Sequence, residues 1–115
     1  MIYMLQILYD PSVPVDSNRP SLQPQHAELE RELREQGIYL GGAGLAPVEN
    51  GRRMRVKADR RLAMDGPFAE SKEVLGGFFV VECKDAGEAL EIATRVPTNE
   101  QSWIEVRRIG IWHPL

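Results

Sequence analysis

The sequence predicts an α+β domain: a split βαβ sheet with two helices on one face and a hairpin inserted in its middle. Segments with strand-like alternation and segments with helical spacing follow one another in the order strand, helix, short strands, strand, helix, strand. The strands around residues 3–9 and 78–83 are apolar on both alternating faces, which is typical of strands covered on both sides. The 115 residues suffice for one compact domain, so 1–115 is expected to be a single domain.

The first part of the chain supplies one strand and one helix. Ile2–Tyr9 is rich in apolar and aromatic residues, and a loop with three prolines, 10–20, follows it. A helix is expected over Pro24–Gln36, because proline is tolerated in a first turn, and Gly37 is its stop. The inner stripe of this helix consists of Leu29 and Leu33.

The middle of the chain is expected to hold short strands. Ile38–Leu40 predicts one of them, and the following "GGAGLAP" is interpreted as a turn, because a dinucleotide-binding loop would need a helix after it. A hairpin comes next: Met54 and Val56 alternate with basic residues, "ADR" reverses the chain, and Leu62 and Met64 return it.

The last part repeats the strand–helix–strand order. Leu75–Cys83 predicts a second buried strand, and Gly76–Gly77 indicates a bulge or a close backbone approach at its start. Asp85 is the expected helix cap, with Glu88 completing a capping box. Trp103–Ile109 alternates again and is the last long strand, followed by an apolar tail, 109–115. The apolar helix positions are Ala86, Ala89, Leu90 and Ala93, and Pro97 ends their pattern.

Composition narrows the function classes. The net charge of −3 gives no general attraction to nucleic acid or to an anionic membrane. The single cysteine, Cys83, excludes an intrachain disulfide and is interpreted as a packing residue. The N-terminus lacks the features of a signal peptide, so a cytoplasmic protein is expected. Two histidines and one cysteine make no metal-ligand spacing, and nothing in the sequence requires a cofactor.

A basic run in the hairpin raises the possibility of nucleic-acid binding. It lacks interleaved aromatic residues, so a solvated hairpin face explains it better. The run consists of Arg52, Arg53, Arg55, Lys57, Arg60 and Arg61.

Two residues are candidates for chemistry. His26 lies on the inward stripe of the first helix, where it either bonds a backbone carbonyl or acts as a general acid/base. Asp65 follows a strand and precedes the rigid "GPF" turn, where it either caps the turn or orients an imidazole.

The segment "MDGPFAESKEVLGGFFVVE" resembles the signature of the DGPF-domain, YCII-related family. "YMLQILYD" is similar to the family's opening strand, and "LREQGIYLGGAGLAP" to its first helix exit and turn. The resemblance covers the chain up to about Arg108. It implies a ferredoxin-like fold that assembles as a dimeric α/β barrel.

The resemblance also implies a site and two possible roles. A histidine and an aspartate are proposed as an active pair in the YCII branch; His26 matches that histidine, and Asp65 is the DGPF aspartate. An isomerase- or lyase-like reaction on a small cyclic or aromatic compound is one role, and the candidates to line its pocket are Tyr3, Tyr9, Tyr39 and Phe68. The alternative is a non-enzymatic metabolite-sensing or regulatory module associated with an extracytoplasmic-function sigma factor.

A second copy of the chain is an expected partner. Helices on one face of the predicted sheet leave the other face bare, and soluble monomers rarely expose so large an apolar surface. We therefore predict a homodimer packed through the open sheet face. The tail "IGIWHPL" is predicted to reach across to the partner with Trp112 as its anchor, which makes His113 a rim residue.

Overall fold

The structure, a computed structural model, describes residues 1–13, 21–65 and 73–114 of the chain, without the side chains of residues 64 and 65. Phe68, Leu115 and most of the "DGPF" turn lie outside the described residues. The elements in chain order are β1 (Ile2–Tyr9), α1 (Gln23–Glu35), β2 (Tyr39–Gly44), a 3₁₀ turn (Val48–Asn50), β3 (Arg52–Lys57), β4 (Arg60–Asp65), β5 (Val74–Glu82), α2 (Ala86–Thr94) and β6 (Ser102–Arg108).

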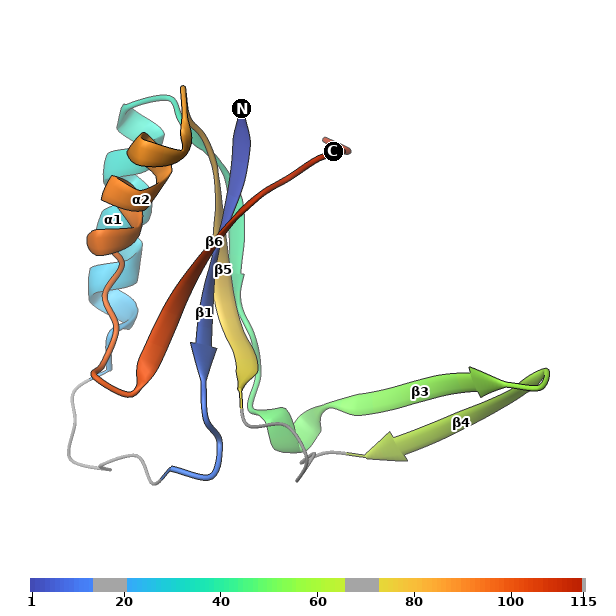
Figure 1. Cartoon of the computed structure of the whole chain (residues 1–115). Helices are drawn as coiled ribbons and strands as arrows, with labels where there is room; N and C mark the ends of the chain where they lie inside the picture. Colours follow the sequence, from blue (N-terminus) through green and yellow to red (C-terminus); the bar gives the residue numbers. More distant parts are fainter. Residues whose placement is uncertain (14–20, 66–72, 115) are drawn as a thin grey trace.

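The main sheet has the strand order β2–β5–β1–β6, and each neighbouring pair is antiparallel. Both helices cover one face of this sheet, as Figure 1 shows. This is the α+β, ferredoxin-like arrangement that the order of elements predicts.

The core lies between the helices and the sheet. Strand residues that face the helices alternate with residues on the open face, so the inward set of β1 and β5 meets the inner stripes of α1 and α2. Leu5, Leu33 and Val81 are fully buried. The other buried members of the cluster are Tyr3, Leu29, Phe79, Cys83, Ala89, Ile92, Ala93 and Val96.

Local signals placed most of the element ends correctly. Gly37 stops α1 with a φ of 73°, a conformation that glycine adopts without strain. The Asp85 carboxylate accepts a hydrogen bond from the backbone N–H of Glu88 at 2.9 Å, as expected for the cap of α2. The pairing of β1 with β5 shifts between Ile7 and Leu8, which leaves Gly76 as the extra residue of a bulge.

One expectation was wrong. "GGAGLAP" is not a turn from its start, because Gly41–Gly44 belong to β2 and pair with β5. At Gly42 the absence of a side chain lets the β2 backbone approach that of β5 closely, so glycine serves strand pairing there. Leu90 is 55% exposed, because α2 packs through Ala89, Ile92 and Ala93, a stripe that leaves Leu90 to one side.

The hairpin forms a sheet of its own. Among the described strands, β3 and β4 pair only with each other, and they project from the main sheet on the side opposite the helices (Figure 1). Ala58 and Asp59 make the two-residue reversal, both with positive φ, as a tight hairpin turn of the right twist requires.

Among the described residues, the helices are too short or too polar to cross a bilayer.

Candidate functional site

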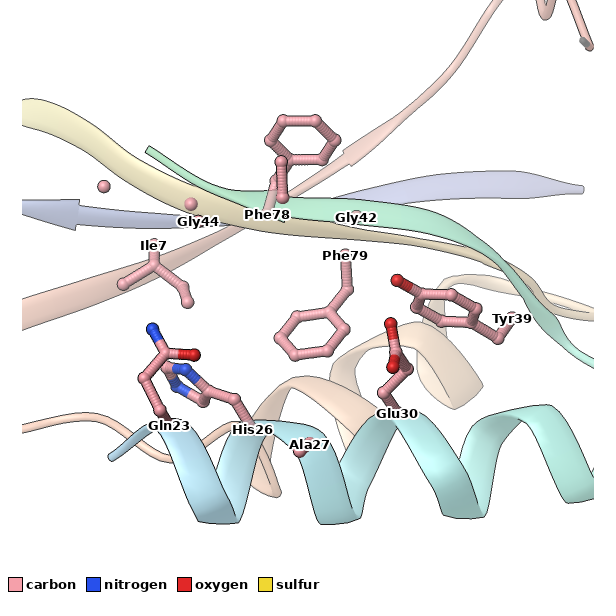
Figure 2. A pocket seen from close by; sticks show the side chains of 13 residues that line it. Ile7, Gln23, His26, Ala27, Glu30, Tyr39, Gly42, Gly44, Phe78 and Phe79 are labelled. Atoms are coloured by element: carbon pink, nitrogen blue, oxygen red, sulfur yellow. The ribbon is translucent and has the colours of Figure 1, made fainter. Parts of the chain in front are cut away.

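A cavity of about 320 Å³ lies between α1 and the β2–β5 end of the sheet. Figure 2 shows side chains of α1 pointing across it toward the sheet, with Phe79 rising from β5 to meet them and Phe78 turned to the other face. Its walls are apolar on the sheet side and polar along α1, a common composition for small-molecule sites. The cavity is lined by Ile7, Gln23, His26, Ala27, Glu30, Tyr39, Gly42, Ala43, Gly44, Gly76, Gly77, Phe78 and Phe79.

His26 is held in the cavity wall by a backbone carbonyl. Its Nε2 lies 2.7 Å from the carbonyl oxygen of Pro97, just beyond α2. A carbonyl oxygen can only accept, so Nε2 carries a proton and donates it. In the neutral ring the lone pair is therefore on Nδ1, which is the atom free to accept a proton or a ligand hydrogen bond. The ring also meets Phe79 edge-on, with centroids 6.0 Å apart.

Glu30 and Tyr39 form a second polar group in the same cavity. The Tyr39 hydroxyl donates to the Glu30 carboxylate, and the two side chains point toward each other in Figure 2. Burial, the Glu30 hydrogen bond and the Glu30 charge raise the pKa of Tyr39 to about 12. The Arg34 guanidinium lies over the Tyr39 ring, 4.6 Å from the ring centroid, and within 3.7 Å of the Glu30 carboxylate.

Gly42 makes room for the Tyr39 hydroxyl. A Cβ placed on Gly42 would lie 2.6 Å from the carbonyl oxygen of Phe78 and 2.9 Å from the Tyr39 hydroxyl, closer than side chains tolerate. The β2 backbone can therefore sit against β5, and the phenol against the backbone, only because this residue has no side chain.

His26 and Ile7 also line a second hollow, of about 250 Å³, toward the N-terminal end of α1. Tyr9, Asp10 and Leu22 are among its other walls. His26 thus lines two concave surfaces, and its hydrogen-bond partner Pro97 lines the second of them.

The predicted site residues lie in different parts of the structure. His26 and Tyr39 line the main cavity, and Tyr9 lines the second hollow. Tyr3 is buried in the core, with its hydroxyl 3.9 Å from the sulfur of Met1. Asp65 is the last residue of β4, paired in register with Arg52, and its side chain lies outside the described part of the chain. The pairing of Asp65 with His26 therefore stays a prediction, as does the role of Phe68.

Two polar residues of the cavity had not been singled out from the sequence. Glu30 lies one helical turn after His26, and Gln23 lies one turn before it. The signal was present, since residues at i, i+3 and i+4 share a helix face. Glu30 does not stand out in the sequence, because α1 carries several acidic residues and most of them make exposed ion pairs, such as Glu28 and Glu35 with Arg31.

Cys83 is 3% exposed and packs in the core, as expected. Burial raises the pKa of its thiol, which disfavours the reactive thiolate. In the described ranges, His, Cys, Asp and Glu side chains do not gather in threes as metal ligands would.

Comparison with known proteins identifies one family and one individual protein that are similar to this chain. The sequence model of the YCII-related domain matches residues 1–113. An uncharacterised protein of Rhizobium meliloti (strain 1021) is 34% identical over 88 residues, which is 75% of this chain and 71% of that protein.

Proposed function

Because the chain belongs to the YCII-related domain family, and because His26 lines a cavity between α1 and the sheet, we propose that the protein binds a small cyclic or aromatic molecule in this cavity. The single observation that carries this proposal is the anchored imidazole. A histidine whose ring orientation and tautomer are fixed by a carbonyl presents one defined acceptor, as general bases do.

The polar wall of the cavity suggests the chemistry of the ligand. Nδ1 of His26 and the carboxylate of Glu30 are both acceptors, and the Gln23 amide offers either role. A ligand with a flat apolar body fits against Phe79 and Ile7, and a hydroxyl or amino group on it would satisfy the acceptors. Nδ1 would take a proton from such a ligand and return it elsewhere, the step common to isomerases and lyases.

Asp65 is proposed to support this chemistry from the end of β4. Since Pro97 already holds Nε2, the Asp65 carboxylate would act by accepting a hydrogen bond from Nδ1 once Nδ1 has taken up a proton, or by binding the ligand directly. An Asp65→Asn variant tests this: a shift in the pH profile of turnover or binding supports the role, and an unchanged profile contradicts it.

A homodimer through the open sheet face is part of the proposal. Trp103 is 68% exposed on this face, and Met4, Leu8 and Phe78 are half-buried there. Oε1 of Gln6, at the middle of the same face, is buried and has no hydrogen-bond partner within the part of the chain that the structure describes. A second sheet packed here would cover the apolar side chains and bring a donor to Gln6.

The experiment is a thermal-shift screen of small aromatic and cyclic compounds, with and without hydroxyl or amino substituents. Ligand at a hundred times its dissociation constant adds about 2.7 kcal/mol of stability. His26→Ala is expected to lose the shift and any turnover, and His113→Ala, in the exposed tail, is the matched control. If His26→Ala keeps both, the assignment of His26 fails.

Binding without turnover would favour the alternative role, a metabolite-sensing module such as one associated with a sigma factor.

A further inference from the structure

The β3–β4 hairpin is a large feature that the cavity does not use. Each residue from Arg52 to Ala63 is exposed, including the large apolar side chains of Met54, Val56 and Leu62, which are 61%, 64% and 50% exposed. A two-stranded hairpin standing alone is at best marginally stable in water. Its exposed apolar residues therefore indicate that another surface covers it.

The charge of the hairpin identifies the chemistry of that surface. Residues 52–65 contain six basic and two acidic side chains, a net charge of +4. The whole chain has a net charge of −3, so the remainder of the chain carries −7. The hairpin and the body of this protein are thus complementary in charge, and complementary potentials favour specific association.

The hairpin extends away from the body of its own chain. It points away from the main sheet on the open-face side, so that sheet and hairpin form two arms of an angle (Figure 1). A second sheet packed on the open face would occupy that angle. The hairpin would then run along the body of the second chain.

The exposed area is consistent with such a contact. A folded chain of 13.0 kDa is expected to expose about 6,300 Å², whereas this one exposes 8619 Å². The excess is larger than the roughly 800 Å² that each partner loses in an interface of standard size. A stable dimer therefore needs to bury only part of this excess exposed area.

We propose that the hairpin of residues 52–65 clasps the acidic body of a second copy of this chain, and that the second copy's hairpin does the same in return. The register places Met54 and Val56 on one hairpin face and Leu62 on the other, and both faces also carry basic residues: Arg52 and Arg61 on the first, and Arg53, Arg55, Lys57 and Arg60 on the second. Each face of the hairpin therefore combines apolar and cationic side chains. The proposal rests on the open-face dimer and extends it, and the experiment separates the two.

The first test uses two exposed apolar residues of similar exposure. Val56→Asp in the hairpin is expected to raise the dimer dissociation constant about tenfold or more, measured by sedimentation velocity. Leu90→Asp, 55% exposed on α2 on the helical side, is expected to leave it unchanged. Trp103→Asp on the open face is expected to weaken the dimer as well.

The second test uses charge. Lys57 and Arg60 are cross-strand partners beside the hairpin turn, and reversing both to Glu is expected to weaken the dimer and reduce its salt dependence. Lys84→Glu, an exposed lysine outside the hairpin, is the control. Backbone amides of β3 and β4 should gain protection from hydrogen exchange as the protein concentration rises through the dissociation constant.

The outcomes separate the clasp from the sheet contact. If Trp103→Asp dissociates the dimer while Val56→Asp and the charge reversal leave it intact, the clasp is wrong and the open-face dimer stands. A chain that stays monomeric at every concentration tested overturns both. Unprotected hairpin amides in a proven dimer also overturn the clasp, whether or not the substituted hairpins fold.

Discussion

The close approach at Gly42 makes a sharp test of the cavity geometry. In Gly42→Ala the new methyl carbon would lie 2.6 Å from the Phe78 carbonyl oxygen, an atom of the β5 backbone. Backbone in a central strand cannot move aside as a side-chain tip can, so the variant carries the cost of overpacking, about 1–3 kcal/mol. Gly41→Ala is the matched control, because a Cβ there meets nothing within 4 Å.

The two variants are expected to diverge in urea unfolding at one fixed protein concentration. Gly41→Ala should be neutral or stabilising, by up to about 0.4–1 kcal/mol, because alanine lowers the entropy of the unfolded chain. Gly42→Ala should lower the free energy of unfolding. Equal free energies for the two variants would refute the close approach of β2 to β5.

The same two variants also test the position of the Tyr39 phenol through its pKa. The methyl group of Gly42→Ala would lie 2.9 Å from the Tyr39 hydroxyl and push it away from Glu30. The pKa of Tyr39 should then fall from about 12 toward its ordinary value. Ultraviolet titration of the phenols measures this, with Tyr39→Phe identifying the signal and Gly41→Ala expected to match the wild type. A Tyr39 titration unchanged by Gly42→Ala would contradict the contact.

Three further predictions follow from burial and charge. Glu30→Gln removes a charge that opposes ionisation of Tyr39, so the pKa of Tyr39 should fall, which phenol titration measures. In the wild type the raised pKa means that the stability supplied by the neutral phenol is complete below about pH 10 and is lost as the pH rises through about 12. Unfolding measured as a function of pH checks this dependence. Leu33→Ala should lower the free energy of unfolding by about 2–5 kcal/mol, because Leu33 is fully buried. Leu90→Ala, at a half-exposed site, should change the free energy of unfolding by less than about 1 kcal/mol. Similar losses for the two variants would contradict the packing of the helices. Deletion of Trp112–Leu115 should raise the dimer dissociation constant in sedimentation experiments, because the described tail residues up to Pro114 are exposed and extend away from the helices (Figure 1); an unchanged constant would show that the tail does not hold the dimer.

Periodicity predicted the main sheet and the helices because each of them buries one face. Leu29 and Leu33 are spaced for a helix that packs on a sheet, and both are buried. In β1 and β5 both faces are apolar, so the alternation predicted strands but not which of their residues face the helices; that assignment comes from the structure. Where burial decides the structure, the pattern of apolar residues records it.

The pattern failed where side chains do not decide the structure. Gly41–Gly44 has almost no side chains to alternate, so its composition indicated a turn although its backbone pairs with β5. The same property hid the wall of the cavity. Gly42 matters there for the space it leaves, and the atom nearest to that space belongs to Phe78, which lies far along the sequence on β5.

The partnership of Glu30 with Tyr39 was out of reach for a related reason. The helix position of Glu30 is visible in the sequence, but its partner lies on β2, across the gap between helix and sheet. No periodicity within one element reports a contact between two elements. The interaction became recognisable only once the packing of α1 on the sheet was known.

The two interpretations of His26 were set against each other in the sequence, yet the structure makes them compatible. In one interpretation His26 only forms a hydrogen bond with a backbone carbonyl and has no chemical role, and the carbonyl of Pro97 accepts such a bond. The same bond fixes the proton on Nε2, assigns the lone pair to Nδ1 and stops the ring from turning, which are the conditions that a general base requires. The anchor, Pro97, lies three residues beyond the end of α2, so the orientation of the imidazole depends on how α2 packs beside α1. A satisfied nitrogen on one side of the ring is therefore no argument against proton transfer on the other.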